Sequence, residues 1–365
     1  MTADGPLRGF TVATTAERRR DELGALLERR GARVLSAPAI TIVPLLDDAA
    51  LHAATAACVT HAPDIVVATT GLGFRGWLEA AEGWGVGDGL RGALRAARLI
   101  ARGAKPCGAI RAAGLTEHWS APTESCAEIL AKLLAEGVSG RRVAVQLHGG
   151  PQDDFTRALR TAGADVVEVP VYRWTRREDA EPLRRLVDQI VTGQVDAVTF
   201  TSAPAVAALL DASGDRAPAV LDAFGDRVLA ACVGPVTAAP LRDRGVPALV
   251  PDRARLGALV RAVTDTLPSR ARRLTVAGVT VELRGHAAIV DGEYRTLAPA
   301  SMAMLRALAA QPGAVVSRTL LAGALPRGAE GHAIDMAVAR LRSSLGAADL
   351  VETVIKRGYR LRMSA

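Results

Sequence analysis

Two groups of residues in this 365-residue sequence have types and spacings suited to binding anions. The first group consists of segments rich in hydroxyls and glycines, each between an apolar run and a helical pattern: Thr69-Thr70-Gly71, Gly149-Gly150-Pro151, Thr201-Ser202-Ala203-Pro204 and Gly234-Pro235-Val236-Thr237. Free N–H groups at a helix N-terminus attract carboxylates and phosphates. Each segment alone also fits plain N-capping, which any α/β protein shows, whereas several of them facing one cleft would favour a binding site.

The second group lies within Gly331–Arg362, which begins with a helical period and Gly346 as its C-terminal residue. The apolar face holds Ile334, Val338, Leu341 and Leu345. The opposite face is small or polar and holds His332, Met336, Ala339, Arg340 and Ser343. A strand over Val351–Ile355 then leads into a basic turn, Lys356-Arg357-Gly358-Tyr359-Arg360. This pattern suits a DNA groove with adjacent phosphates, but a solvated helix beside an ordinary hairpin fits it too.

The distribution of charge favours the DNA interpretation. The net charge is +7, and residues 268–365 hold 14 Lys and Arg against 7 Asp and Glu. The first 267 residues hold 31 of each sign and are therefore neutral. A neutral body with a basic tail predicts a polyanionic partner for the tail alone.

Several other functions are disfavoured by the sequence. The six histidines are dispersed, and the chain has no GxSxG, HExxH or Walker lysine. Gly71–Gly76 matches GxGxxG, but no acidic residue ends a second strand about 20 residues later, so a dinucleotide site is a weak prediction. The four scattered cysteines predict free thiols in a reducing cytosol. We expect no cofactor or metal, no secretory signal and no membrane span, and hence a cytoplasmic protein.

Apolar runs alternate with helical patterns throughout residues 1–267, which is typical of parallel α/β sheets. The expected strand and helix pairs are Gly9–Ala13 with Glu17–Arg30, Asp64–Thr69 with Gly73–Ala81, Arg142–Gln146 with Asp153–Ala162, Ala197–Thr201 with Pro204–Asp211, and Val228–Val233 with Thr237–Arg244. Helices are expected to close at Gly31, Gly114, Gly163 and Gly245. Two sheets fit this length better than one.

Two proline-containing stretches, Ile40–Pro44 and Val169–Arg173, look like crossings between two lobes. If both link the same lobes, lobe one comprises residues 1–37 and 175–267, and lobe two comprises residues 45–168. The strand-to-helix turns of such sheets are the places where ligands bind.

Over residues 7–267 the chain resembles uroporphyrinogen-III synthase. The matching pieces are GARVLSAPAITIVP, DIVVATTGLGF, GRRVAVQLHGG with LRTAGADVVEVPVYRW, VDAVTFTSAPAV and VGPVTAAPLRDRGVPALVP. The resemblance implies two α/β lobes joined by a two-stranded ladder. It also implies an enzyme that closes linear hydroxymethylbilane into uroporphyrinogen III, with inversion of ring D and without metal or cofactor.

The resemblance also implies roles for individual residues. Tyr172 matches a tyrosine beside the cleft, a candidate proton donor to the leaving hydroxyl, although it also fits an amphipathic cleft-edge residue. Thr237 matches the threonine of a G-x-x-T turn and is the second candidate catalytic residue. The candidate substrate-binding residues are Thr70, Gly71, Gly149, Gly150, Thr201, Ser202 and Gly234. Two departures weaken the case for turnover: Thr14-Thr15 replaces Thr-Arg, and Gly103-Ala104-Lys105-Pro106 lacks a threonine.

The tail begins after a polar segment, residues 268–273, which is interpreted as a linker. Strands are expected over Arg273–Ala277, Thr280–Arg284 and His286–Val290. A helix with Pro299 in its first turn should bury Met302, Leu305, Leu308 and Ala309. Ser317 should cap a second helix over Arg318–Ala324.

Residues 274–363 resemble the winged-helix output domain of response regulators of the OmpR/PhoB class, so residues 274–365 are expected to form a DNA-binding domain. The matching pieces are VDGEYRTLAPASMAMLRALAAQPGAVVSRTLL, IDMAVARLRSSLG and TVIKRGYRL. The resemblance implies that the third helix enters the major groove and that the hairpin reaches the minor groove or its phosphates. The implied DNA-binding residues are His332, Ala333, Met336, Ala339, Arg340, Arg342, Lys356, Arg357 and Arg360. Ile355 departs from an arginine common in the class.

The leading hypothesis is a transcriptional regulator whose receiver is replaced by synthase-like sensor lobes. Its expected partners are double-stranded DNA, a linear or cyclic tetrapyrrole or another polycarboxylate, and a second copy of the chain on DNA. The same fusion occurs in nitrate and nitrite assimilation regulators of high-GC bacteria, and sirohaem made from uroporphyrinogen III serves nitrite reductase. A working synthase tethered by its tail and a bifunctional protein are the alternatives.

Overall fold

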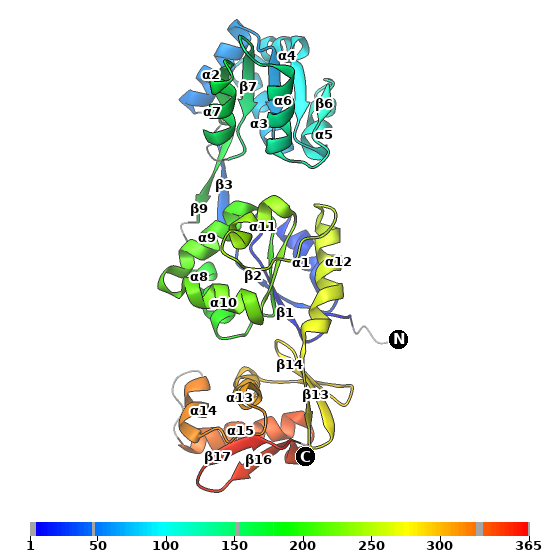
Figure 1. Ribbon diagram of the computed structural model, residues 1–365, viewed down its shortest axis with the longest axis vertical. Helices are drawn as coiled ribbons and strands as arrows, with labels where there is room; N and C mark the ends of the chain where they lie inside the picture. The colour runs from blue at the N-terminus through cyan, green and yellow to red at the C-terminus, as the bar shows by residue number, and fades with distance from the viewer. Residues whose placement is uncertain (1–4, 46–47, 150–152, 178, 326–330, 364–365) are drawn as a thin grey trace. The chain divides into compact units, whose positions relative to one another are not determined.

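The computed structural model of the protein describes residues 5–45, 48–149, 153–177, 179–325 and 331–363. The chain divides into two compact units. The first combines Met1–Ala39 with Arg177–Ala365, and the second is the continuous segment Ile40–Arg176. Figure 1 shows that each unit contains a sheet with helices packed beside it.

Four parallel strands in the order β11-β10-β1-β2 form the first sheet of the first unit. They are β1 (Thr11–Thr14), β2 (Arg33–Ser36), β10 (Ala197–Phe200) and β11 (Leu229–Cys232). The accompanying helices are α1 (Arg20–Glu28), α8 (Glu181–Val191), α9 (Ala203–Ser213), η1 (Gly214–Arg216), α10 (Ala217–Asp226), α11 (Pro235–Arg242), α12 (Leu256–Thr266) and η2 (Leu267–Arg270). Strands β1, β10 and β11 are buried along their whole length, as expected of a parallel sheet covered on both faces.

Five parallel strands in the order β6-β5-β4-β7-β8 form the sheet of the second unit. They are β4 (Ile65–Ala68), β5 (Arg98–Ala101), β6 (Trp119–Ser120), β7 (Arg142–Gln146) and β8 (Asp165–Val169). The helices are α2 (Ala49–Thr60), α3 (Gly71–Gly83), α4 (Gly87–Ala96), α5 (Ala104–Ala112), α6 (Cys126–Glu136) and α7 (Asp153–Thr161). The prediction of two parallel sheets is therefore confirmed.

The alternation of side chains along β4 explains how this sheet is covered on both faces. Val66 packs into one cluster with Phe74 and Trp77, while its neighbour Val67 packs into another with Leu133. Successive residues of a strand point to opposite faces of the sheet, so an apolar run such as Ile-Val-Val-Ala has to be covered on both faces.

A two-stranded antiparallel ladder lies outside both parallel sheets. It pairs β3 (Ile40–Pro44) with β9 (Tyr172–Arg176), and Ile42 lies opposite Trp174. The first crossing has the predicted bounds. The second is shifted, because Val169 ends β8 in the parallel sheet and the ladder begins only at Tyr172.

The tail begins with an antiparallel sheet in the order β12-β13-β14-β15. Its strands are β12 (Arg272–Val276), β13 (Val279–Leu283), β14 (Ala287–Val290) and β15 (Glu293–Thr296). The helices α13 (Pro299–Ala310), α14 (Arg318–Ala324) and α15 (Gly331–Leu345) follow, then η3 (Ala348–Leu350) and the hairpin β16 (Val351–Val354) and β17 (Gly358–Leu361). This is a winged-helix domain, as predicted.

The sequence patterns of the tail match the structure closely. Ser317 caps α14 by accepting a hydrogen bond from the N–H of Leu320, and Gly346 follows α15 with a positive φ of 75°. The apolar face predicted for α15 lies in the core, which contains Ile334, Val338, Leu341 and Leu345. Strand β15 was not predicted, because Glu293–Thr296 is a polar segment with no apolar run.

Helices α1, α5, α7 and α11 are followed by Gly31, Gly114, Gly163 and Gly245, which all have positive φ, as expected of closing glycines. The exact domain boundaries at residues 37, 45, 168, 175 and 267 stay predictions, and the proposed linker 268–273 overlaps η2 and the start of β12. Every helix in the described part of the chain is too short or too polar to cross a lipid bilayer.

Candidate functional site

In the second unit, Gln146 organises the turn that follows β4. Its side-chain oxygen accepts hydrogen bonds from the N–H groups of Thr69, at 3.2 Å, and Thr70, at 3.0 Å. Thr69 returns a hydroxyl hydrogen bond of 2.7 Å to the carbonyl of Gln146. Because Gln146 ends the neighbouring strand β7, these bonds fix the Thr69-Thr70-Gly71 turn at the carboxyl edge of the sheet. No pattern in the sequence indicates this role of Gln146.

Tyr172 and Thr70 meet in this unit although they are far apart in the sequence. The Tyr172 hydroxyl donates a hydrogen bond of 3.3 Å to Thr70 Oγ1, which also accepts from the N–H of Gly73 at 3.1 Å. A Cβ added to Gly149 would lie 2.8 Å from Tyr172 Cε2 and 2.7 Å from Trp174 Cδ1. Thr70, Gly149 and Tyr172 are therefore neighbours, whereas Gly150 lies outside the described residues.

Close packing accounts for the glycines of the GxGxxG match. Gly71 begins α3, and a Cβ there would approach the carbonyl oxygen of Lys105 to 2.6 Å. A Cβ at Gly73 would lie 2.1 Å from Gln146 Nε2. These glycines allow α3 to pack against its neighbours, so they need no dinucleotide to explain them.

His148 and Arg102 add to this edge of the sheet and were not among the predicted residues. Burial, and to a lesser extent the positive charge of Arg102, together lower the pKa of His148 to about 4. His148 Nδ1 is buried and has no hydrogen-bond partner within the described parts of the chain. His148 is therefore a neutral, mostly buried imidazole close to the positive charge of Arg102.

In the first unit, the turn after β1 differs from the arginine-containing turn of the resembling family. Thr15 is fully buried, and its hydroxyl donates a hydrogen bond of 3.0 Å to the carbonyl of Thr199. Thr14 Oγ1 accepts from the N–H of Ala16 at 3.3 Å. Both hydroxyls are therefore used within the sheet and the turn.

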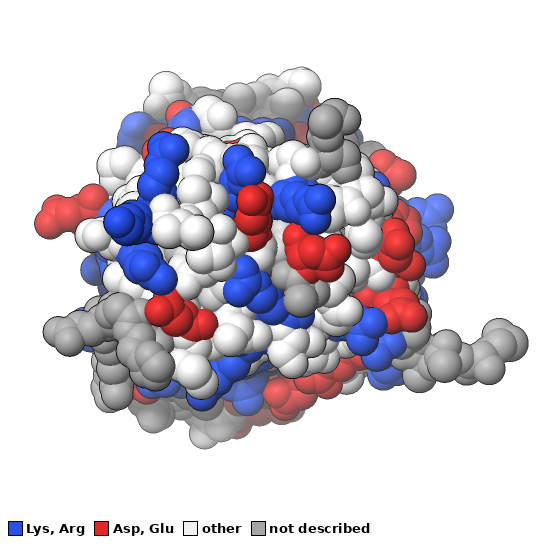
Figure 2. All heavy atoms as spheres, turned by 90° about the horizontal axis from the view of Figure 1, so that it is seen from below, with Lys and Arg blue, Asp and Glu red and all other residues white. Residues whose placement is uncertain are grey.

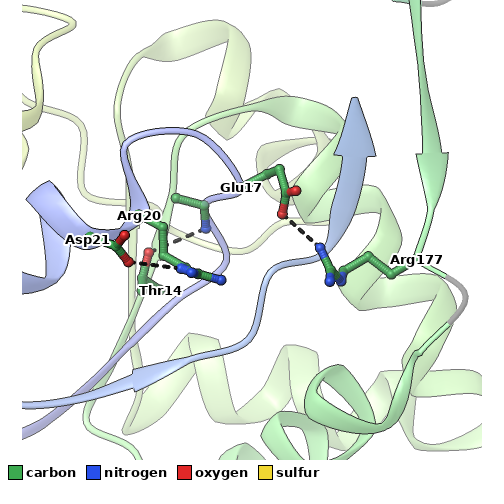
Figure 3. Close-up of polar contacts among 6 residues, drawn as sticks. Thr14, Glu17, Arg20, Asp21 and Arg177 are labelled. Carbon is green, nitrogen blue, oxygen red and sulfur yellow. Dashed lines mark hydrogen bonds and ion pairs between the residues drawn. The ribbon is translucent and has the colours of Figure 1, made fainter. Parts of the chain in front are cut away.

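Two arginines lie beside this turn, as Figure 3 shows, and each is paired with a carboxylate. Arg177 Nη1 lies 2.9 Å from Glu17 Oε2, and Arg20 Nε lies 3.1 Å from Asp21 Oδ1. A ligand carboxylate would have to compete with Glu17 for Arg177. The two arginines beside this turn are therefore already paired with carboxylates.

The other predicted residues of the first unit lie on neighbouring strand ends. Thr201 and Ser202 follow β10, and Gly234 follows the adjacent strand β11. Thr237 lies in the first turn of α11 and is only 6% exposed. The predicted ligand residues thus form two sets, one in each unit.

In the tail, the solvent-exposed face of α15 carries most of the residues expected to contact bases. Ala333, Met336, Ala339 and Arg340 are exposed, and Met336 is 45% exposed although it is apolar. The side chain of His332 lies outside the described part. An exposed helix face with small residues and an exposed arginine suits the major groove.

Arg342 is engaged within the protein rather than presented with Arg340. Its Nε and Nη2 donate to the carbonyl of Val351 at 2.9 and 2.6 Å, and Nη2 also donates to Thr353 Oγ1 at 2.9 Å. Arg360 is similarly paired across the hairpin with Glu352, at 2.8 Å. Both arginines therefore brace the hairpin, and the direct DNA contact expected of them from the sequence stays a prediction.

The hairpin tip carries two exposed cations. Lys356 and Arg357 are exposed, and Lys356 adopts a positive φ of 60° in the turn closed by a hydrogen bond from the N–H of Arg357 to the carbonyl of Val354. Ile355 beside them is 82% exposed. Figure 2 shows the face of the tail, where lysine and arginine side chains are spread with acidic side chains between them.

A network not predicted from the sequence connects α14, α15 and the hairpin. The Tyr359 hydroxyl donates to Asp335, and Arg318 Nη2 lies 2.9 Å from the same carboxylate. Val316 forms an isolated antiparallel bridge with Tyr359, with hydrogen bonds in both directions. These contacts fix the orientation of the exposed helix face relative to the hairpin tip.

The fold and these surfaces define a class of protein: two α/β lobes with candidate ligand turns, followed by a winged-helix DNA-binding domain. Residues 21–261 match the family described as Uroporphyrinogen-III synthase HemD, and residues 292–361 match the family described as Transcriptional regulatory protein, C terminal. The chain belongs to the uroporphyrinogen-III synthase family and carries a C-terminal DNA-binding domain of the OmpR/PhoB type.

Three similar proteins illustrate the match to the first part of the chain. Uncharacterized protein YjjA of Bacillus subtilis (strain 168) is 30% identical over 257 residues, which cover 70% of this chain and 94% of that protein. A putative uroporphyrinogen-III synthase of Methanothermobacter thermautotrophicus is 30% identical over 147 residues, 40% of this chain and 58% of that protein. The structure of a mutant uroporphyrinogen III synthase from Thermus thermophilus has a TM-score of 0.60 and 31% identity, covering 70% of this chain and 99% of that one.

Proposed function

We propose that the protein is a DNA-binding transcription regulator whose synthase-like part binds a polycarboxylate, a linear or cyclic tetrapyrrole, as its effector. The observation that carries this proposal is the exposed face of α15 beside the cationic tip of the hairpin, on a domain that holds all of the chain's excess positive charge. The family matches support the same assignment at both ends of the chain.

The proposed reading surface consists of Arg340 with the small exposed residues around it, and of Lys356 and Arg357 at the tip. A helix in the major groove and a wing on the adjacent groove would place base contacts on α15 and phosphate contacts on the tip. We propose that two copies bind half-sites about one helical turn of DNA apart. Genes of nitrate and nitrite assimilation are the proposed targets.

The test starts from DNA selected out of a random pool by the wild-type protein. Arg340→Ala should lose discrimination between the selected and scrambled sequences by about ten-fold or more, since one good bidentate contact contributes about 1–3 kcal/mol. Arg95→Ala, which removes an exposed arginine of α4, should bind like wild type. Unchanged discrimination by Arg340→Ala would remove α15 as the reading surface, and mapping bound sites across the genome would test the pathway.

Turnover is the alternative function, and the pairing of Tyr172 with Thr70 is the observation that favours it. The tyrosine hydroxyl could donate a proton where the family places its tyrosine. Against it, Thr15 is buried where the family has an arginine. Incubation with hydroxymethylbilane decides: formation of the type III isomer would show synthase activity, and formation of only the spontaneous type I isomer would exclude it.

A further inference from the structure

Segments far apart in the sequence meet at the amino end of the first sheet. They are the Arg8–Gly9 turn before β1, Asp196 before β10, the Gly285–His286 turn between β13 and β14, and Arg306 on α13. All of them belong to the first unit. The contacts among them, which we call the Asp196 joint, attach the DNA-binding domain to the synthase-like sheet.

The backbone hydrogen bonds that cross the joint are donated by the tail. The N–H of Gly285 donates to the carboxylate of Asp196, whose Oδ2 also accepts from the N–H of Thr11 on the neighbouring strand at 2.7 Å. The N–H of His286 donates to the carbonyl of Gly9 at 3.0 Å, and His286 Nδ1 lies 3.3 Å from Thr11 Oγ1. A carboxylate removed from water needs such donors, so these bonds make the docking specific.

Two arginines of the tail, Arg306 and Arg284, lie close enough to lower the pKa of the same carboxylate. Arg306 Nη2 donates to the carbonyl of Gly285 at 2.6 Å, and Arg284 donates to the carbonyl of Arg8. The guanidinium of Arg8 in turn lies 3.9 Å from the ring centroid of Tyr294. The negative charge of Asp196 acts on both tail arginines, which links the two domains electrostatically as well as by hydrogen bonds.

The contact is close enough to exclude any side chain at its centre. A Cβ at Gly285 would lie 2.0 Å from Asp196 Oδ2 and 2.7 Å from the N–H nitrogen of Thr11. Gly9 has a positive φ of 87°, and a Cβ there would lie 3.1 Å from the Cβ of Ala287. Backbone of the tail therefore lies directly against backbone of the sheet.

Strand β10 connects this joint to a candidate ligand turn. It begins just after Asp196 and leads to Thr201-Ser202, and its paired neighbour β1 begins at Thr11. The two strands are paired in register and are only four residues long, about 13 Å. A displacement at the carboxyl ends of these strands can therefore be transmitted to the joint through a few close-packed residues.

We propose that the Asp196 joint couples occupancy of the ligand turn after β10 to the DNA affinity of the tail. The proposal rests on the proposed function, because it needs both a ligand on the synthase-like part and DNA on the tail. Ligand and DNA then influence each other's binding by one reciprocal factor, typically on the order of 5- to 150-fold.

The first test measures amide hydrogen exchange in the full-length protein without ligand. The N–H group of His286 should be protected in wild type, since it is bonded across the joint to the carbonyl of Gly9. Gly285→Ala should speed its exchange at least about ten-fold. Gly225→Ala, with open space at its Cβ on α10, is the matched control and should exchange like wild type.

The second test measures coupling, with uroporphyrin III as the octacarboxylate probe and DNA selected by the wild-type protein. The probe should change the DNA affinity of wild type and of Gly225→Ala by the same factor. In Gly285→Ala that factor should fall to about 1, while each ligand alone still binds. Arg306→Met, which removes the bond to the Gly285 carbonyl, should reduce the factor in the same direction if Gly285→Ala does not fold.

The outcomes separate this proposal from the proposed function. Coupling that persists in Gly285→Ala or Arg306→Met, or wild-type protein that binds both ligands independently, overturns the joint and leaves the two binding activities standing. Failure to bind the probe refutes the proposed effector class. The exchange measurement then tests the joint by itself, and an unprotected His286 N–H in wild type would overturn it as well.

Discussion

At the scale of single residues, Asp196 makes the stability of the first unit depend on pH. Removal of its carboxylate from water raises its pKa to about 6, from an ordinary value of 3.8, against the opposing effects of the Thr11 and Gly285 N–H groups, Arg306 and Arg284. A raised folded-state pKa means that the folded protein binds this proton more tightly than the unfolded chain. The contribution is present below pH 3.8 and is lost as the pH rises through 6.

Asp196→Asn should therefore gain stability relative to wild type as the pH rises from 4 to 7.5, by at most about 3 kcal/mol. Chemical denaturation across this pH range measures the difference. Burial chiefly lowers the pKa of His286, but this residue is present in both proteins. Its effect on the free energy of unfolding therefore largely cancels in the difference between them. Asp222→Asn, on the exposed surface of α10, is the control, and its free energy of unfolding should change with pH as that of wild type does. A constant difference between Asp196→Asn and wild type at all pH values would contradict the assignment.

Arg340 and Arg342 should separate DNA binding from stability. Arg342→Ala should lower the free energy of unfolding of the tail by about 1–2 kcal/mol, because it leaves the carbonyl of Val351 without its donors. Arg340→Ala, two residues earlier on the same helix, should stay within about 0.5 kcal/mol of wild type. Denaturant titration of both variants checks this, and equal losses would show that Arg342 has no bracing role.

Residue types identified the turns of the site but not its contacts. Thr70 and Tyr172 could be selected from their positions in the sequence, whereas their meeting depends on the ladder that places Tyr172 beside α3. Arg342 shows the converse, since nothing in R-L-R tells which arginine faces solvent. The position of its guanidinium depends on Val351, which approaches only after the chain turns back.

At the scale of elements, Gly358 in strand β17 allows the hairpin to pack against the segment that precedes α14. Gly358 has a φ of 137°, and a Cβ there would lie 2.0 Å from the carbonyl oxygen of Val316. The strand bridge between Val316 and Tyr359 requires this close approach. The hairpin is therefore joined to the body of the tail through backbone contact.

Gly358→Ala should destabilise the tail by more than about 2 kcal/mol, from strain and the loss of the bridge. Gly323→Ala in α14 is the matched control, because its Cβ meets open space and helix propensity favours alanine by up to about 1 kcal/mol. Thermal unfolding followed by circular dichroism measures both variants. Equal transition temperatures for the two would mean that the hairpin bridge contributes nothing to stability.

Elements with strong local signals were predictable, and those defined by partners were not. Ile40–Pro44 and Arg318–Ala324 have the predicted bounds, since a proline-bounded apolar run and a Ser cap mark them. The second crossing is shifted by three residues, because Val169–Arg173 is equally extended in sequence and only pairing decides where β8 ends. Strand β15 is polar and is defined by its partner β14.

At the scale of the whole molecule, charge concentrated in the tail should give strongly salt-dependent DNA binding. Each phosphate contact contributes about 0.9 to the slope of log affinity against log salt concentration. Lys356→Ala should weaken binding to selected and scrambled DNA alike and reduce this slope by about 1. Lys132→Ala, which removes a lysine of α6 in the other unit, should keep the wild-type slope. An unchanged slope in Lys356→Ala would place the hairpin tip away from phosphates.

The ladder has a consequence for how the chain folds during synthesis. Strands β1 and β2 are made first, yet their neighbour β10 follows only after the whole second unit. Closing a flexible loop of roughly 140 residues would cost about 4 kcal/mol of chain entropy. Because β3 and β9 place Ile40 opposite Arg176, a second unit that folds first brings the two halves of the first sheet together. The inserted unit thus acts as a folding template for the sheet that holds the DNA-binding domain.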